Sequence, residues 1–501
     1  MAVSANAVAV VTQLDRLGVK RQRMSVDSRG VSAGDVFIAI PGSKVDGRDF
    51  VSTALAQGAA AVLREAPGTA AKFDDTRVID VDNLSVQLGD IADVFYDHPS
   101  SSLRVIGITG TNGKTSIANW LARAFSELSV PCGAIGTLGV SLGATTWPTN
   151  NTTPDAAHLQ TILRDLKDAG ALAVAIEVSS HALELHRVTG TRFDAVVFTN
   201  LTQDHLDFHG TMAAYGAAKA KLFTDYPVKD RIINADDKFG AELIAKKLPN
   251  TLSYGLDQGD VRGDVISMNA SGMRLAISFA GQVISVETRL IGRFNAYNLL
   301  AVAATLIASD VALESVASTL STLTAAPGRM QRVNTVTDAA EPSVYVDYAH
   351  TPDALAKALD TVRETQPHAL TVVFGCGGDR DRSKRPLMGK IAADRAAHVY
   401  VTSDNPRSEQ PLAIIEEIAS GVGMDQRNAL KLIERRRDAI QQAIKTANAK
   451  DAILIAGKGH EAYQEINGVR HPFSDVDEAL AALAARNSLK QKLSEARHVG
   501  Q

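Results

Sequence analysis

Residues 105–116 read V-I-G-I-T-G-T-N-G-K-T-S and carry the pattern of a phosphate-binding loop. An apolar run suited to a buried strand breaks at Gly110, and Lys114 and Thr115 open a helix-compatible segment over 116–128. Glycines let backbone N–H groups turn toward an anion, and a helix N-terminus adds positive potential. The Lys114 ammonium can reach terminal phosphates, and the Thr115 hydroxyl can ligate Mg²⁺. The pattern predicts nucleotide binding rather than a plain glycine-rich turn.

Acids and histidines follow two further apolar runs that read as strands. Glu177 lies near the end of the run over 172–178, where an acid is costly to bury unless it meets a cation, and Mg²⁺ beside Thr115 is the economical candidate. The segment 199–209 contains two acids and two histidines within six residues, at a spacing that is not a zinc pattern. Alone, this cluster fits a solvated or helix-capping group as well as a metal site. Next to a phosphate loop, the cluster instead favours a second Mg²⁺ site that includes His205.

Three other polar side chains lie on helical patterns. Composition alone places Lys219, in the pattern over 212–223, on a solvent-exposed face. Asn295 and Asn298 are three residues apart, so they share a helix face where their amides could bind an adenine edge or, equally, cap the helix.

These residues need α/β domains to position them, and the 501-residue chain is too long for one core. At roughly 150 residues per domain, we expect three domains. They are a small N-terminal α/β domain over 1–100, a central P-loop-type domain with a mostly parallel sheet over 101–328, and a C-terminal Rossmann-like α/β domain over 329–501. The central strands are expected over 103–109, 172–178, 195–200 and 231–235, with antiparallel strands at the sheet edge over 252–291.

The last domain repeats the arrangement of polar residues at strand ends. Its strands are expected over 343–348, 370–374, 398–402 and 452–456, and charged or glycine-rich turns follow them at 347–350, 375–382, 404–407 and 457–461. Because parallel strands end at the same edge of a sheet, the four turns predict one binding rim.

Composition excludes several classes of protein. Lys and Arg total 52 and Asp and Glu 56, so no basic field points to nucleic acid or an anionic membrane. Two cysteines, Cys132 and Cys376, give no disulfide framework and fit a reducing compartment. No run approaches the ~20 apolar residues of a membrane span, and residues 1–23 reverse the order of a secretory signal. We therefore expect a cytoplasmic protein that acts on small molecules, not embedded in a membrane, as a monomer.

Together, the motifs resemble the Mur ligases, and among them those that add the third residue of the peptidoglycan stem peptide. The resemblance covers essentially the whole chain, and the isoleucine at 108 in place of the usual glycine is how this superfamily writes its phosphate loop. It rests on G-T-N-G-K-T-S at 110–116, N-T-T-P at 151–154, E-V-S-S-H-A-L at 177–183, T-N-L-T-Q-D-H-L-D-F-H-G at 199–210, A-A-K at 217–219, N-A-Y-N at 295–298, D-Y-A-H-T-P-D at 347–353, G-C-G-G-D-R-D at 375–381, D-N-P-R at 404–407 and G-K-G-H-E at 457–461.

The resemblance implies a reaction in which ATP activates the carboxylate of UDP-N-acetylmuramoyl-L-Ala-D-Glu as an acyl phosphate, and an amino acid displaces the phosphate. It implies catalytic roles for Lys114, Glu177, His205 and a Lys219 carbamylated by CO₂, and Mg²⁺ held by Thr115, Glu177, His205 and Lys219. The carbamate replaces the expectation of an exposed lysine. The implied ATP-binding residues are Gly110, Thr111, Asn112, Gly113, Lys114, Thr115, Ser116, Asn295, Asn298, Arg329, Asp347 and His350.

The remaining implied contacts hold the two other substrates. The UDP-muramoyl-dipeptide would lie on Val26, Ser28, Ser43, Lys44, Val45, Asn151, Thr152, Thr153, Ser179 and Arg187, its uridine end on the N-terminal domain. The amino acid would lie on Arg380, Asp404, Asn405, Pro406, Arg407, Gly457 and Glu461 of the C-terminal domain.

In this family D-N-P-R accompanies meso-diaminopimelate, whose second carboxylate a guanidinium can grip with two parallel hydrogen bonds. The alternatives are the same reaction with L-lysine, a folylpolyglutamate synthetase-like ligase, or a P-loop regulator or motor that hydrolyses ATP to change shape. Lysine would leave Arg407 unpaired, and the N-terminal unit and the D-N-P-R block argue against the folylpolyglutamate synthetase. A regulator or motor has no need for an amino-acid pocket on its third domain.

Overall fold

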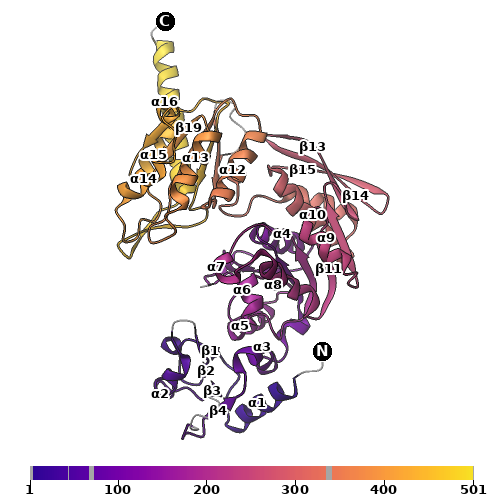
Figure 1. Cartoon of the computed structure of the whole chain (residues 1–501). Helices are drawn as coiled ribbons and strands as arrows, with labels where there is room; N and C mark the ends of the chain where they lie inside the picture. The colour runs from indigo at the N-terminus through magenta and orange to yellow at the C-terminus, as the bar shows by residue number, and fades with distance from the viewer. Residues whose placement is uncertain (1–3, 43–44, 67–72, 150, 335–340, 500–501) are drawn as a thin grey trace. The chain divides into compact units, whose positions relative to one another are not determined.

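The computed structural model describes residues 4–42, 45–66, 73–149, 151–334 and 341–499, with side chains as far as residue 488. The chain forms two compact units (Figure 1). Unit 1 comprises Met1–Gly263, Ile277–Ile284 and Tyr297–Leu320, and unit 2 comprises Asp264–Ala276, Ser285–Ala296 and Ser321–Gln501. Among the described residues, no helix has the length and apolar character needed to cross a bilayer.

Unit 1 begins with a four-stranded parallel sheet in the order β1-β2-β3-β4. Helices α1 and α3 pack on one face of this sheet and α2 on the other. The elements are α1 (Ala5–Arg16), β1 (Met24–Ser25), η1 (Ser28–Gly30), β2 (Val36–Ala39), η2 (Gly47–Phe50), α2 (Val51–Ala56), β3 (Ala61–Glu65), β4 (Val78–Val81), α3 (Leu84–Phe95) and η3 (Pro99–Ser102).

The sequence of helix α1 sets both where the helix begins and which of its faces is buried. The Ser4 side chain accepts a hydrogen bond from the backbone N–H of Ala7 and so caps the helix N-terminus. The buried residues of α1 are spaced at i, i+3, i+4 and i+7, which puts them on one face: Ala7, Val10, Val11 and Leu14. That face packs against the sheet and α3.

A longer sheet follows, in the order β15-β14-β13-β12-β11-β10-β5-β9-β6-β7-β8. Strands β11, β10, β5, β9 and β6 run parallel, so their carboxyl ends share one edge. The elements are β5 (Arg104–Thr109), α4 (Lys114–Glu127), β6 (Cys132–Gly136), β7 (Gly139–Leu142), β8 (Thr145–Trp147), α5 (Ala156–Asp168), β9 (Ala173–Glu177), α6 (Ser180–Glu184), β10 (Phe193–Phe198), α7 (Leu206–His209), α8 (Met212–Thr224), β11 (Val228–Asn234), α9 (Lys238–Ala245), β12 (Thr251–Gly255), β13 (Val261–Asn269), β14 (Gly272–Phe279), β15 (Gln282–Thr288), α10 (Arg293–Ala308) and α11 (Leu313–Thr322).

The structure departs from the expected elements at β12. This strand was expected among antiparallel strands, but it pairs in parallel with both β11 and β13. Helix α10 begins at Arg293, so Asn295 and Asn298 both lie within it. Asn295 donates its side-chain N–H to the Ile291 carbonyl, 2.8 Å away, at the start of that helix.

Unit 2 contains a six-stranded sheet in the order β16-β17-β21-β18-β19-β20, parallel except for β16. β17, β21, β18 and β19 are parallel neighbours, so the four turns end at the same edge as predicted. The elements are β16 (Gln331–Arg332), β17 (Ser343–Asp347), α12 (Pro352–Glu364), β18 (Leu370–Phe374), α13 (Lys384–Arg395), β19 (His398–Val401), α14 (Pro411–Ala419), η4 (Arg427–Ala429), β20 (Leu430–Leu432), α15 (Arg436–Thr446), β21 (Ala452–Ala456), β22 (Tyr463–Ile466), β23 (Val469–Pro472) and α16 (Asp475–Val499).

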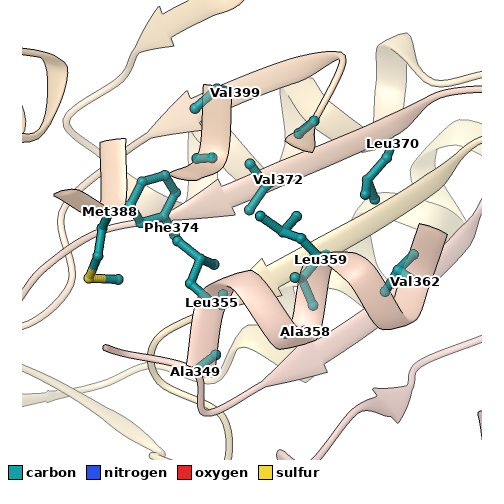
Figure 2. Close-up of a cluster of buried hydrophobic side chains, with 14 of the residues drawn as sticks. Ala349, Leu355, Ala358, Leu359, Val362, Leu370, Val372, Phe374, Met388 and Val399 are labelled. Atoms are coloured by element: carbon teal, nitrogen blue, oxygen red, sulfur yellow. The ribbon is translucent and has the colours of Figure 1, made fainter. Parts of the chain in front are cut away.

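Alternation along the strands builds a core on each face of this sheet. Leu454 and Ala456 of β21 face α12, α13 and α14, whereas Ile453 and Ile455 face α15 and α16. Figure 2 shows the first core, in which Leu355 and Leu359 of α12 pack near Val372 and Phe374 of β18. A parallel sheet covered on both faces needs such uninterrupted apolar strands, and the predicted α/β class is confirmed.

A buried ion pair joins the two helices of the second core. Arg436 donates from Nε and Nη2 to the two carboxylate oxygens of Asp475, at 2.7 Å each, and also to the Ala456 carbonyl. Both side chains are fully buried, so each charge depends on the other.

Replacing Asp475 with Ala should lower the free energy of unfolding of unit 2 by about 3–5 kcal/mol, because it leaves the Arg436 guanidinium buried without its partner. Urea unfolding, followed by far-ultraviolet circular dichroism, measures this change. Replacing Glu478, which pairs with Arg437 on the same two helices but nearer the solvent, should cost about 1 kcal/mol or less. Equal losses for the two variants would contradict the expectation.

Candidate functional site

The loop after β5 has the shape of a phosphate cradle. Gly110 and Gly113 have φ of +143° and +93°, in the region that favours glycine. A Cβ on Gly110 would lie 1.9 Å from Thr199 Oγ1, and one on Gly113 would lie 2.5 Å from Asn298 Oδ1. Both positions therefore exclude a side chain, and the helix α4 that follows directs its N-terminus at the loop, with Ser116 buried in its first turn.

The end of β10 holds this loop in place. Asn200 accepts a hydrogen bond from the Asn112 N–H at 3.0 Å, and its own carbonyl accepts from the Thr111 N–H at 2.8 Å. Thr199 Oγ1 donates to the Asn112 carbonyl at 2.6 Å. The loop thus keeps its shape through contacts to a neighbouring strand.

Two lysines meet at one carbonyl of the loop. Lys114 Nζ donates to the carbonyls of Gly110 and Thr111, at 2.9 Å each, and Lys219 Nζ donates to the same Gly110 oxygen at 2.8 Å. Lys219 is buried, with 1% of its surface exposed, so the composition-based expectation of an exposed lysine is wrong. Burial, and next the positive charge of Lys114, hold the Lys219 pKa well below its ordinary value.

Tyr215 lies beside this pair. Its ring is 4.3 Å from Lys219 Nζ, and its hydroxyl lies 3.2 Å from Thr111 Oγ1. The ring of His205 is 6.1 Å from that of Tyr215, and the ring of His209 is 5.1 Å away. Tyr215 therefore connects the phosphate loop, Lys219 and the histidine cluster.

Glu177 supplies a buried carboxylate at the end of β9, with 1% of its surface exposed. Its oxygens accept hydrogen bonds from Thr115 Oγ1 at 3.0 Å and from Thr137, whose N–H lies at 2.8 Å and whose Oγ1 lies at 3.3 Å. One carboxylate flanked by two hydroxyls is an oxygen donor set of the kind that Mg²⁺ takes when phosphates and water complete its shell. The residues present therefore fit a magnesium ion beside the loop.

His205 stands at the start of α7 with a half-exposed ring. Its Nε2 is 3.4 Å from Asp204 Oδ2, and its ring makes an edge contact with His181. Across the described ranges, no group of three or more His, Cys, Asp or Glu side chains is arranged to hold a metal by itself. Any ion at His205 would thus need ligands from a substrate or from a modified residue.

Several residues expected to hold the muramoyl-peptide lie close to Glu177 and Thr137. Thr153 Oγ1 donates to the Glu177 carbonyl at 2.7 Å and accepts from the Ser179 N–H at 3.1 Å. Arg187 donates to the Thr153 carbonyl, and burial lowers the Arg187 pKa. Thr152 Oγ1 lies 3.2 Å from Thr137 Oγ1, which ties it to the same group, while Asn151 is exposed.

The expected uridine-binding residues lie on the N-terminal sheet of unit 1. Val26 and Ser28 are half-buried after β1, and Val45 is exposed after β2. Ser43 and Lys44 lie outside the described residues. The structure thus places Val26 and Val45 in loops after strands and Ser28 at the start of η1.

In unit 2, three of the residues expected to hold the rest of the nucleotide lie before, at the end of and after β17: Arg329, Asp347 and His350. The Asp347 carboxylate accepts from the backbone N–H groups of Met330 and Ala349, at 2.6 and 2.9 Å, and desolvation raises the Asp347 pKa. The Arg329 guanidinium lies over the Tyr348 ring at 4.7 Å. His350 Nδ1 lies 2.9 Å from the Tyr348 carbonyl.

Several of the residues expected to bind the amino-acid substrate surround the buried ammonium group of Lys458. Lys458 is fully buried and donates to Asn405 Oδ1 at 3.0 Å, to Glu461 Oε2 at 3.1 Å and to Asp404 Oδ1 at 3.4 Å. Asn405 Nδ2 also donates to Glu461 at 2.8 Å. Gly457 has φ of +116°, and a Cβ there would meet Asp404 at 3.1 Å.

Beside this cluster, Arg407 donates from Nη1 to the Gly378 carbonyl at 2.7 Å. Pro406 is buried in the same loop, and Arg380 is exposed in the turn after β18. The structure thus brings the turns after β18, β19 and β21 together on one rim, lined by both charges, where an amino acid with several ionic groups could bind.

Sequence reasoning assigned no role to five residues that the structure places in these sites: Thr137, Asn200, Tyr215, Lys458 and Glu465. Asn200 and Lys458 lie inside recognised motifs, so their position was a usable signal. Thr137 and Glu465 sit in ordinary-looking segments, and only the folded chain reveals their partners.

Comparison with known proteins gives three family matches along the chain. They are "Mur ligase family, catalytic domain" over residues 22–96, "Mur ligase middle domain" over 108–306 and "Mur ligase, glutamate ligase domain" over 328–459.

Two similar curated proteins carry the name UDP-N-acetylmuramoyl-L-alanyl-D-glutamate--2,6-diaminopimelate ligase. The protein from Chromobacterium violaceum is 47% identical over 479 residues, covering 94% of this chain and 96% of its own. That from Ectopseudomonas mendocina is 46% identical, covering 93% and 96%. A solved structure titled with the same enzyme name is 37% identical, with a TM-score of 0.69 over 93% of this chain and 95% of its own.

Replacing Gly113 with Ala should weaken ADP binding at least about tenfold, because a methyl group there clashes with Asn298 and a positive φ costs ~1–2 kcal/mol for a residue with a side chain. Isothermal titration calorimetry measures the change in Kd. Gly143 is a matched control, since it also has a positive φ but no atom near its would-be Cβ. If the Gly113 variant bound ADP as the wild type does, the loop would not be the nucleotide site.

Proposed function

This chain belongs to the Mur ligase family, and we propose that it is an ATP-dependent ligase that adds meso-2,6-diaminopimelate to UDP-N-acetylmuramoyl-L-Ala-D-Glu. The observation that carries the proposal is that one chain combines a phosphate loop beside a buried carboxylate with an Arg407 pocket of mixed charge. A regulator that only hydrolyses ATP needs the first of these sites and has no use for the second.

The proposed reaction has two steps, phosphorylation of a carboxylate and displacement of the phosphate by an amine. A glutamyl carboxylate oxygen attacks the γ-phosphorus of ATP, which releases ADP and leaves an acyl phosphate. The neutral amine of diaminopimelate then attacks the carbonyl carbon, loses a proton and expels inorganic phosphate. Activation is needed because a carboxylate is a poor electrophile, and phosphoryl transfer depends on alignment and charge neutralisation more than on covalent catalysis.

The phosphate-loop residues bind and orient ATP in this scheme. Lys114, which donates to two loop carbonyls in the structure, turns to the terminal phosphates when they arrive. Thr115 and Glu177 would hold Mg²⁺, and His205 would hold a second ion. Bound Mg²⁺ supplies neutralisation of the charge that develops on the phosphates. Asn298 adjoins the loop within unit 1, and Asn295, Arg329, Asp347 and His350 are assigned to the remainder of the nucleotide.

We assign Lys219 to a carbamate. An amine adds to CO₂ only when it is neutral, and the lowered pKa of Lys219 makes its neutral form easier to reach than that of an ordinary lysine. The nitrogen then attacks the carbon of CO₂ and loses a proton, which turns a potential cation into an anion. An anion there offers an oxygen ligand to Mg²⁺, whereas an ammonium would repel the ion.

Arg407 is assigned to the distal carboxylate of diaminopimelate, and Glu461 to its distal ammonium. Lysine would leave the guanidinium without a carboxylate, and losing a charge-assisted contact of this kind costs roughly 2–3 kcal/mol, or ~30–150-fold in selectivity. Residues 1–100, 101–328 and 329–501 are proposed as the UDP-sugar-binding, ATP-binding and amino-acid-binding domains, and the protein as a cytoplasmic monomer.

Phosphate release from ATP should depend on both UDP-N-acetylmuramoyl-L-Ala-D-Glu and meso-diaminopimelate. A coupled phosphate assay, with one substrate omitted at a time, measures this dependence. Mass spectrometry of the product, with diaminopimelate and lysine in competition, identifies the amino acid that is added. ATP hydrolysis indifferent to both substrates would favour a regulator, and a lysine product would overturn the choice of amino acid.

Replacing Lys219 with Ala should abolish ligation, and added acetate should restore part of the activity, because its carboxylate can occupy the place of the carbamate. Removing CO₂ from the buffer should slow the wild-type enzyme, an effect that bicarbonate reverses. Lys221 of the same helix α8 is half-exposed and pairs with Glu184, so its Ala variant is the control. Wild-type activity that ignores CO₂, together with no rescue by acetate, would remove the carbamate from the proposal.

A further inference from the structure

The first strand and the turn of a short hairpin in unit 2, β22–β23, are joined to the D-N-P-R loop. Glu465 N–H donates to Asn405 Oδ1 at 2.9 Å, and Gln464 Nε2 donates to the Asp404 carbonyl at 2.6 Å. Arg407 N–H donates to the Glu465 carbonyl at 3.0 Å, and Asn467 N–H donates to the Arg407 carbonyl at 2.7 Å. Strand β22 of the hairpin therefore forms a wall of the proposed amino-acid pocket.

These hydrogen bonds fix the backbone of Arg407, and separate contacts orient its side chain. Arg407 has φ of +51°, an unusual conformation for a residue with a side chain, and its bridge to Ile466 holds the backbone in it. The guanidinium is then held from two sides. Nη1 donates to the Gly378 carbonyl at 2.7 Å, and Nε lies 3.7 Å from Glu465 Oε2.

We propose that Glu465 is a positioning residue that sets the amino-acid specificity through Arg407. Its carboxylate attracts the Nε edge of the guanidinium while Gly378 holds Nη1, so the Nη2 side is presented to the distal carboxylate of the incoming amino acid. Among the contacts of the described residues, none engages Nη2. This inference rests on the proposed function, because it takes Arg407 as the group that grips diaminopimelate.

The charge of Glu465, rather than the hairpin itself, is the feature that matters. The hydrogen bonds that join β22 to the loop use no side-chain atom of Glu465, so they persist when the carboxylate changes. Both side chains of the pair are about a quarter exposed, at 23% and 24%, which leaves them open to a substrate and makes their attraction modest.

The test is a double-mutant cycle with Glu465→Gln and Arg407→Ala in the full chain. Glu465→Gln should raise the KM for diaminopimelate about two- to fivefold, with kcat and the KM values for ATP and the UDP-muramoyl-dipeptide unchanged. The preference for diaminopimelate over lysine should fall by the same factor. In the Arg407→Ala background, which itself has a much higher KM, Glu465→Gln should have no further effect.

Glu416→Gln is the matched control, because it makes the same change at an exposed site on α14 and should leave all kinetic constants unchanged. If Glu465→Gln raises the KM equally with and without Arg407, Glu465 contacts the substrate itself and the positioning role is wrong. If it leaves the KM unchanged, the charge has no role. A wild-type protein inactive with diaminopimelate would instead overturn the proposed function, so the two failures are distinguishable.

Discussion

One carbonyl oxygen, that of Gly110, accepts hydrogen bonds from both Lys114 and Lys219, and this shared acceptor constrains the chemistry of the whole site. Two ammonium groups close to one buried oxygen repel each other, and the more buried of them yields its proton more readily. Burial, followed by the positive charge of Lys114, accordingly lowers the Lys219 pKa. This lowered pKa is what the carbamate proposed for Lys219 requires, because only a neutral amine adds to CO₂.

The buried lysine of unit 2, Lys458, has surroundings opposite to those of Lys219. Lys458 is surrounded by Asp404, Asn405 and Glu461, whose oxygens satisfy its charge instead of suppressing it. Because these partners follow β19 and β21, the lysine ties two turns of the rim together. Arg407, at the edge of the same cluster, is held less completely and so remains able to meet a ligand. The difference between Lys458 and Arg407 is one of burial and of how many oxygens surround the charge.

Sequence reasoning succeeded where one local pattern decides one local structure. Continuous apolar runs gave the buried parallel strands, as at 370–374 and 452–456, because a strand covered on both faces has no polar side to interrupt it. It failed where a partner far along the chain decides. β12 pairs in parallel although its short run looked like part of a meander, and Lys219 is buried although its helix pattern carries little sign of which face is covered.

The sequence by itself determined the phosphate loop, the acids and histidines near it, the D-N-P-R block and the resemblance that joins them, since each is a contiguous motif with its own local chemistry. Tertiary structure decided what surrounds those motifs: Thr137 on Glu177, Lys219 on the Gly110 carbonyl and Glu465 beside Arg407. These partners are 40, 109 and 58 residues apart in sequence, and only chain folding sets the distances on which pKa values, ion pairing and the orientation of a guanidinium depend.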